Sequence, residues 1–371
     1  MSLTAADQSM VVERPRGRSH DYWFLASAAG LIGVGLFSLA SLDAGQDTSF
    51  FTRQLIFAAL GLVVFLFFNR IRLETFRVLA TPLYIINILL LAATLVVGRG
   101  RGVTQRALDL GFMQFQPSEL TKILLALTLA AYFANREDRI KELGTWLGAL
   151  GHIAPILALV YLQPHMGATL SLLFMAIMGA IHIGVPWKYF PATLLGIVVL
   201  GGLLFTFKLI PEYQLKRFET KLSAVKTGKK DIRGDDYQIH QGTLAIGSGG
   251  VTGAGFFQGD QKESGVIPEQ QNDLIFTVIG EEGGLVGSSL VLCLFAFFFY
   301  RVWLRVWQAK TVMGIVTGSC LFAVIAFHFL VNMSMVLGMG LVIGLWLPFM
   351  SAGGTALWMC MAAVGLLDQC E

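Results

Sequence analysis

The chain consists mostly of long apolar runs separated by short polar segments. Because an α-helix needs about 20 apolar residues to cross the hydrocarbon core of a bilayer, each run predicts a membrane-spanning helix. Ten such helices are predicted, near 22–42, 53–69, 79–98, 118–134, 144–163, 166–184, 188–209, 283–302, 311–331 and 350–367. The predicted fold is therefore all-α, a polytopic membrane protein with about ten transmembrane helices and one long outer loop between helices 7 and 8.

Composition agrees with this pattern. Of the 371 residues, 55% are hydrophobic and 14% are charged, and the mean hydropathy is +0.67, which excludes an ordinary soluble domain. We expect a cytoplasmic N-terminal tail over 1–21 and a single transmembrane domain over 22–371, with an extracytoplasmic loop over about 210–282. The first apolar run is long and many others follow, so it predicts a first membrane helix and no cleaved signal peptide.

The Lys and Arg residues of the short loops predict the orientation. With the N-terminus inside, thirteen of them lie on the cytoplasmic side and four lie outside, so both termini are predicted to be cytoplasmic. The outer four are Arg53, Arg99, Arg101 and Arg106. Three of these lie in one loop against the general bias, and an anionic ligand is one candidate explanation.

Several kinds of chemistry lack support. The glycine-rich stretch from Gly247 to Gly255 has Thr252 where a dinucleotide fingerprint needs its third glycine, and no P-loop lysine follows. The six histidines show no metal-ligand spacing, and the four cysteines favour packing over a disulfide framework. The net charge of +3 is too small to indicate a nucleic-acid partner. The apolar, glycine-rich segment YQIHQGTLAIGSGGVTGAG is predicted to return to the membrane interface.

The stretch FQPSELTKI places an ionisable pair at the outer end of the fourth span. Pro117 suits a first helical turn, and Ser118 is a candidate cap. Glu119 and Lys122 lie three residues apart, on one helix face, where ionisable groups at a membrane boundary are costly and are functional candidates by default. A purely structural ion pair is the alternative.

The stretch GVIPEQQNDLIFTVIGEEGG is rich in carboxylates beside an apolar run. Asn272 and Asp273 fit an ordinary helix cap, but Asp273 equally fits a general base at the rim of an outward cavity. Glu281 follows eight residues later, roughly 80° around a helix, so both carboxylates could face one groove. His165, in the turn QPHMG, is interpreted as structural. The segment LPFMSAGGTALW is expected to begin the last span at Pro348, with its GG pair permitting close helix packing.

Six segments taken together resemble the SEDS family (shape, elongation, division and sporulation), the peptidoglycan glycosyltransferases of the RodA and FtsW branches, and RodA more than FtsW. They are FQPSELTK, QPHMGAT, YQLKRF, YQIHQGTLAIGSGGVTGAG, GDQKESGVIPEQQNDLIFTVIGEEGG and LPFMSAGG. The resemblance implies polymerisation of lipid II on the outer face of the membrane, with release of undecaprenyl pyrophosphate. Two departures are His165, where the family usually has an acid, and Ala352, where it often has tyrosine.

The resemblance also implies which residues form the site. The family's essential aspartate falls on Asp273, the expected catalytic base. The family's substrate-site residues fall on Glu119, Lys122 and Arg217. The nearby cations Lys216, Arg106 and Arg101 are expected to bind substrate with them, and Glu281 joins this set through its helical spacing from Asp273. The lysines and arginines of this set would meet the departing pyrophosphate, directly or beside a divalent cation such as Mg or Mn, which the sequence itself does not reveal.

The partners implied are lipid II, membrane lipids and a class B penicillin-binding protein that supplies the transpeptidase, with no nucleic acid. The partner's helix is expected against the later spans, which carry small and aromatic residues such as Gly353, Gly354 and Trp358. The expected location is the bacterial cytoplasmic (inner) membrane. Two alternatives stay open: a flippase that transports lipid II, and a non-catalytic scaffold for the penicillin-binding protein.

Overall fold

The computed structural model describes residues 20–44, 49–98, 107–109, 111, 113–206, 235–259, 267, 269–340 and 343–370. The helices that correspond to the ten predicted spans are α1 (Tyr22–Asp43), α2 (Phe50–Arg70), α4 (Ala80–Val97), α5 (Pro117–Ala134), α6 (Leu143–Leu162), α7 (Met166–His182), α8 (Tyr189–Thr206), α12 (Phe276–Gln308), α13 (Val312–Val336) and α14 (Gly354–Leu367). Within the described ranges, six helices are long and apolar enough to cross a membrane. The all-α polytopic fold is thus confirmed.

Short elements complete the structure. They are α3 (Leu73–Val78), the 3-10 helix η1 (Glu137–Arg139), α10 (Asp235–Ser248), and a two-stranded antiparallel sheet of β1 (Leu108–Asp109) and β2 (Gln114–Phe115). In α10, the segment expected to return to the membrane interface forms a helix that packs against α12.

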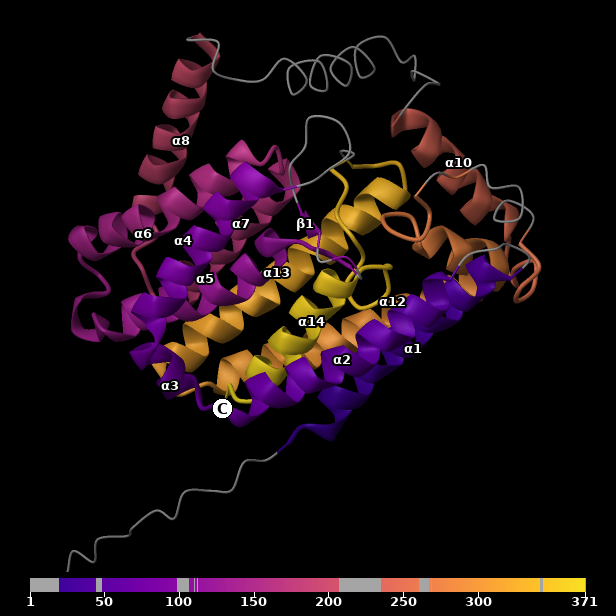
Figure 1. The fold of residues 1–371 in the computed structure, drawn as a ribbon, viewed down its shortest axis with the longest axis horizontal. Coiled ribbons are helices and arrows are strands. Elements are labelled where there is room, and N and C mark those ends of the chain that lie inside the picture. The colour runs from indigo at the N-terminus through magenta and orange to yellow at the C-terminus, as the bar shows by residue number, and fades with distance from the viewer. Residues whose placement is uncertain are drawn as a thin grey trace, which may run out of the picture.

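Helix α5 lies at the centre of the bundle (Figure 1). All of its residues from Thr121 to Ala131 are buried, under α13, α4, α14 and α3. Around this centre α2 packs along α14, α1 along α12, and α7 along α13. Helix α8 projects from the rest (Figure 1) and leaves large apolar side chains such as Leu194 and Val198 exposed. A helix that is apolar on every face and central to the bundle is an expensive place for charged groups.

Helix α12 begins at Phe276, earlier than the predicted 283, and is interrupted at Gly284, where φ is 60° and ψ is −155°. The interruption exchanges hydrogen bonds with the glycine-rich turns after α10. The N–H groups of Leu285 and Val286 donate to the carbonyls of Gly250 and Val251, at 2.9 and 3.1 Å. In return the carbonyls of Glu281 and Glu282 accept from the N–H groups of 254 and 255. The glycines between 247 and 255 therefore allow this stretch of backbone to pack directly against the backbone at the break in α12. This role is structural and differs from that of a nucleotide-binding loop.

The last helix begins at Gly354, so the prediction that it starts near 350, with Pro348 at its beginning, was wrong. Residues 343–353 are not helical, and side chains satisfy much of their backbone. The Gln54 amide donates to the carbonyl of Ser351 and accepts from the N–H of Gly353, at 3.1 and 3.0 Å. Irregular backbone at this depth is tolerated in membrane proteins only where protein or a polar cavity surrounds it.

An ionic cluster joins the start of α1 and the end of α14 through two arginines of α12. Arg301 binds the carboxylate of Asp21 with Nε at 2.9 Å, and the buried Arg305 contacts Asp368 at 3.1 Å. His20 lies 2.6 Å from the same Asp368. Burial opposes ionisation of Asp21, but the Phe24 N–H and the two arginines outweigh it and keep the pKa of Asp21 below its ordinary value of 3.8. The start of α1 and the end of α14 therefore meet on one side of the bundle.

Candidate functional site

The Glu119–Lys122 pair lies in the first turns of α5, whose residues are almost all buried by the surrounding helices. The Lys122 ammonium lies 2.8 and 2.7 Å from the two carboxylate oxygens of Glu119. The side chains are 0% and 2% exposed. The pair predicted from the sequence is therefore present and is buried away from solvent. In such a buried site charge-assisted hydrogen bonds are strongest and unpaired charges are most costly.

Polar and aromatic groups surround the pair. Pro117 occupies the first turn as predicted, but Ser118 does not cap the helix, whose N-cap is Gln116. Instead the Ser118 hydroxyl and the Gln116 amide both approach Nδ1 of the buried His165, at 3.3 and 3.1 Å. This agrees with the structural interpretation of His165, which fixes the turn before α7 to the start of α5. On another side, the Lys122 ammonium lies 4.9 Å from the centroid of the Trp346 ring, a cation–π distance.

Asp273 lies in the turn before α12, since that helix is capped at Ile275 with no side-chain hydrogen bond. The helix-cap interpretation of Asn272 and Asp273 was therefore wrong. So was the helical projection that put Asp273 and Glu281 on one face, because Asp273 precedes the helix. The Asp273 carboxylate instead borders Gly344: a Cβ added there would lie 3.2 Å from its Oδ2.

Glu281 lies on α12 just before the break at Gly284. It is buried, and a Cβ added to Gly259 would lie 2.9 Å from its Oε2. Its neighbour Glu282 accepts a 2.5 Å hydrogen bond from the Ser41 hydroxyl of α1. The Glu282 carboxylate thus joins the break to α1, and the Glu281 carboxylate lies against Gly259 after α10. A substrate-binding role for Glu281 stays a prediction.

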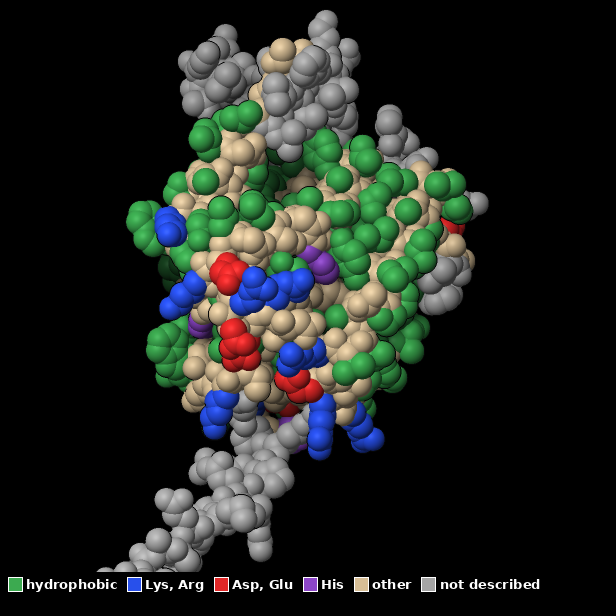
Figure 2. Space-filling view, turned by 90° about the vertical axis from the view of Figure 1, so that its left-hand side faces the viewer, with side chains coloured by type: hydrophobic (Ala, Val, Ile, Leu, Met, Phe, Trp, Pro, Cys, Tyr) green, Lys and Arg blue, Asp and Glu red, His purple; other side chains and the backbone are tan. Residues whose placement is uncertain are grey.

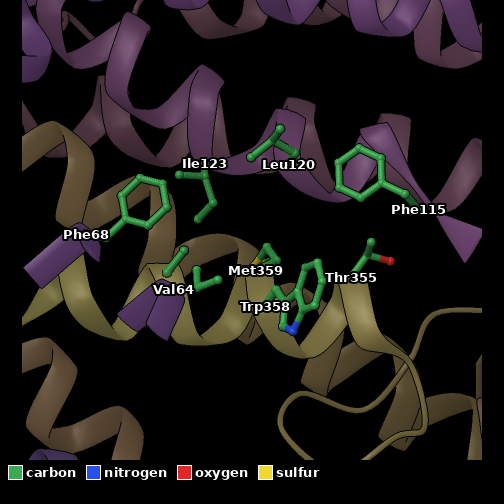
Figure 3. A pocket seen from close by; sticks show the side chains of 9 residues that line it. Val64, Phe68, Phe115, Leu120, Ile123, Thr355, Trp358 and Met359 are labelled. Carbon is green, nitrogen blue, oxygen red and sulfur yellow. The ribbon is translucent and has the colours of Figure 1, made fainter. Parts of the chain in front are cut away.

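An apolar crevice lies on the other side of α5. It has a volume of about 160 Å³ and is lined by Val64, Phe68, Phe115, Leu120, Ile123, Thr355, Trp358, Met359 and Ala362. In Figure 3, the side chains of Leu120 and Ile123 from α5 face those of Trp358 and Met359 from α14. Leu120 immediately follows Glu119 in the sequence, so the crevice and the charged pair occupy different faces of the same turns of α5.

Surface charge is unevenly distributed. Figure 2 shows Lys, Arg, Asp and Glu side chains gathered over the middle and lower part of one face, with hydrophobic side chains over most of its upper part. The connection between α5 and α6 contributes to such charge, with Arg136, Glu137, Asp138, Arg139 and Glu142 all exposed. This charge is distinct from the buried pair and agrees with a polar, solvated connection between two spans.

Four of the predicted site residues, Arg101, Arg106, Lys216 and Arg217, lie outside the described residues. Among the described residues, no three His, Cys, Asp or Glu side chains are grouped so that they could hold a metal ion. These residues therefore form no protein cage for Mg or Mn, and the divalent cation stays a prediction from the resemblance.

Asn332 and Trp346 also contact this site, although neither was among the residues predicted from the sequence. Asn332 is a fully buried amide on α13, one residue beyond the predicted ninth span, and its position among apolar residues was the available signal. Trp346 stood in an apolar run and gave no signal of its contact with Lys122.

Comparisons with known proteins agree with this architecture. The family model described as cell cycle protein, FtsW/RodA/SpoVE, matches residues 20–371. The peptidoglycan glycosyltransferase MrdB of Escherichia coli (strain K12) is 33% identical over 324 residues, which cover 87% of this chain and 86% of that protein.

Two solved structures are also similar. One is a chain from a peptidoglycan synthase complex that coordinates polymerization and crosslinking, with a TM-score of 0.80, 26% identity and coverage of 95% of this chain and 97% of that chain. The other is the rod shape determining protein RodA of Thermus thermophilus, with a TM-score of 0.67, 25% identity and coverage of 95% and 97%. The chain belongs to the FtsW/RodA/SpoVE family, the SEDS proteins.

Proposed function

We propose that this protein is a peptidoglycan glycosyltransferase that polymerises lipid II into glycan strands during cell elongation. It would act at the outer face of the bacterial cytoplasmic membrane, with both termini inside, and release undecaprenyl pyrophosphate. The observation that carries the proposal is the buried Glu119–Lys122 pair, which lies between an apolar crevice and the segment bordering Asp273. Similarity to the glycosyltransferase MrdB supports the reaction class.

One backbone segment, 344–346, contacts both Asp273 and Lys122, which supports a shared site. Asp273 borders Gly344, and Lys122 lies over Trp346, two residues further along the same segment. Two chain steps span at most about 7 Å. The carboxylate and the ammonium therefore contact residues at the two ends of one short piece of backbone.

The chemistry follows from these groups. Asp273 takes the proton of the acceptor hydroxyl as its oxygen bonds to the anomeric carbon of the donor sugar. The bond from that carbon to the phosphate oxygen breaks, and undecaprenyl pyrophosphate leaves with the bonding electrons. Lys122 stabilises the negative charge that develops on the leaving group, in a site from which water is largely excluded. Lipid-linked donors have an α-linked phosphate and the glycan is β-linked, so a single displacement with inversion needs one base and no covalent intermediate.

The crevice between α2, α5 and α14 supplies an apolar site for part of a polyprenyl chain. All of its lining except the Thr355 hydroxyl is hydrocarbon, aromatic or thioether, so burying isoprene units there gains about 25 cal/mol per Å² of apolar area. A polyprenyl chain bound in the crevice would thereby hold its pyrophosphate group beside α5.

A class B penicillin-binding protein is the proposed partner, supported by similarity to a chain of a peptidoglycan synthase complex. The partner surface expected at Gly354 and Trp358 needs revision, because a Cβ added to Gly354 would lie 3.0 Å from the ring of Phe57, and the Trp358 indole donates to the carbonyl of Phe57. These residues pack α14 against α2. The exposed apolar face of α12, which includes Leu290, is the better candidate surface.

The test uses the purified protein with lipid II and reads product length on a gel. Wild-type protein should give long glycan, and Asp273→Ala should give none while keeping its thermal midpoint, since Asp273 lies in a turn and contributes little to packing. Asp109→Ala, which removes another outer carboxylate, exposed on strand β1, is the matched control and should polymerise normally. Lipid II transport without polymer would favour the flippase alternative. Normal polymer from Asp273→Ala would overturn the assignment of the base.

A further inference from the structure

Asn332 joins two segments that are distant in sequence. Its side-chain amide nitrogen donates to the carbonyl oxygens of Asp273, at 2.7 Å, and of Leu345, at 2.6 Å. Because both partners are carbonyls, which only accept, the orientation of the amide is fixed by its hydrogen bonds. Asn332 is 0% exposed, so water is not available to replace either bond.

The segment 344–346, which Asn332 binds at the carbonyl of Leu345, contacts both parts of the proposed site. On one side Gly344 borders the carboxylate of Asp273, and on the other the Trp346 ring lies beneath the Lys122 ammonium. Helix α13 also holds Trp346 directly: the ring of His328, one turn before Asn332, packs on it with centroids 4.2 Å apart. Residues four apart share a helix face, so one face of α13 holds the segment at two successive points.

We propose that Asn332 is a positioning residue for glycosyl transfer, which sets the place of the Asp273 turn relative to Trp346 and Lys122. This rests on the proposed function, because it needs Asp273 and Lys122 to act on one substrate. Asn332 touches neither reacting group through its side chain. It acts by fixing the backbone of residue 273 and the backbone next to Trp346 to the same helix position.

The predicted effect of losing these bonds is on the chemical step. A displacement of about 1 Å between reacting groups can lower a rate about 100-fold. Substrate affinity depends instead on the apolar crevice and on charges that Asn332 does not touch. We therefore expect Asn332→Leu to lower kcat at least tenfold with KM changed less than threefold.

Gln54 provides a matched control for a merely structural role. Its buried amide also makes two hydrogen bonds to the irregular segment before α14, with Ser351 and Gly353, and it is 3% exposed. Those bonds hold the far end of the segment, away from Gly344 and Trp346. If any loss of two buried hydrogen bonds impaired the enzyme, Gln54→Leu would match Asn332→Leu.

The experiment compares wild-type protein, Asn332→Leu and Gln54→Leu, purified in detergent with lipid II. It measures kcat and KM for polymerisation, and hydrogen–deuterium exchange in peptides covering 269–275 and 344–347. We expect Asn332→Leu to lower kcat selectively and to increase exchange in both peptides, and Gln54→Leu to leave kcat within threefold of wild type. Asn332→Ala is the second variant if the leucine prevents folding, because it removes both donors without placing an apolar group against two carbonyls.

Each outcome decides a stated point. An unchanged kcat in a folded Asn332 variant would overturn the positioning role, and so would an equal loss in Gln54→Leu. Wild-type protein that makes no polymer would overturn the proposed function. Exchange would then still decide whether Asn332 holds the Asp273 turn, and unchanged exchange in 269–275 would show that it does not.

Discussion

The ion pair on α5 allows a test that separates stability from catalysis. Glu119→Gln removes the charge that neutralises Lys122, whose ammonium is completely buried and lies 2.7 Å from the carboxylate. Breaking one partner of a buried pair typically destabilises a protein by about 3 to 5 kcal/mol, because the other charge is left without compensation. With an unfolding entropy of about 2.1 cal/mol/K per residue, this loss lowers the thermal midpoint of a chain of this size by about 4 to 6 °C.

The double variant Glu119→Gln, Lys122→Met removes both charges and keeps similar side-chain volumes. Replacing a whole buried pair by uncharged groups is often neutral or stabilising, so the double variant should recover most of the lost thermal stability. If Lys122 stabilises the leaving group, the polymerisation rate of the double variant should still be at least about 100-fold below that of wild type. This is similar to the effect of removing one charge-stabilising donor.

Thermal unfolding in detergent and lipid II polymerisation on the same preparations provide the two readouts. Recovery of both stability and polymerisation in the double variant would refute the catalytic reasoning and make the pair structural. Arg139 and Glu142, an exposed i,i+3 pair in the connection between α5 and α6, are the matched control. Exposed pairs contribute about 0 to 1 kcal/mol, so neutralising these two residues should change neither readout appreciably.

Three further predictions follow from the structure. Gly284→Ala should destabilise the protein by about 1 to 3 kcal/mol or more, because only glycine readily adopts this backbone conformation and the new Cβ would lie 2.8 Å from the Val251 carbonyl; Gly283→Ala, with open space around it, should have little effect on the thermal midpoint. Since the pKa of Asp21 is lowered from 3.8, its stabilising contribution should be complete above that pH and lost as the pH falls through the lower folded-state value; the thermal advantage of wild type over Asp21→Asn should shrink from pH 7 to pH 3, and a constant difference would contradict this. Adding the class B penicillin-binding protein should raise the polymerisation rate, and Leu290→Trp on the exposed face of α12 should reduce this stimulation more than Leu60→Trp on α2.

The fold was largely predictable because the membrane imposes a simple code. Apolar runs of the right length located all ten helices, usually within a few residues. The larger differences occurred in the last three helices: α12 runs from Phe276 to Gln308, α13 extends to Val336, and α14 starts at Gly354. Hydropathy does not distinguish a helical apolar segment from an irregular one, so it could not show that 343–353 is irregular and mostly buried.

The site was predictable as far as charge was its signal. Glu119 and Lys122 stood out because ionisable groups are rare in membrane helices, and the structure brings them together. The prediction that Asp273 and Glu281 share one helix face was wrong because it assumed a continuous helix through both residues. Contacts made by Asn332 depend on residues separated by 13 and 59 positions, and sequence spacing within one helix cannot reveal such pairs.

The distribution of regular and irregular backbone distinguishes the two ends of the bundle. At one end Arg301 and Arg305 join the beginning of α1 to the end of α14 through ion pairs, and the helices there are continuous. At the opposite end α12 is interrupted at Gly284, α14 is preceded by eleven non-helical residues, 343–353, and the turn with Asp273 stands before α12. Backbone freed from helices must find partners in a bilayer, and here those partners include Asn332, Gln54 and the turns after α10. The buried pair on α5 belongs to this irregular end, so the protein places its costly charges where broken helices already demand polar partners, and the continuous helices of the other end provide the rigid support that keeps them in place.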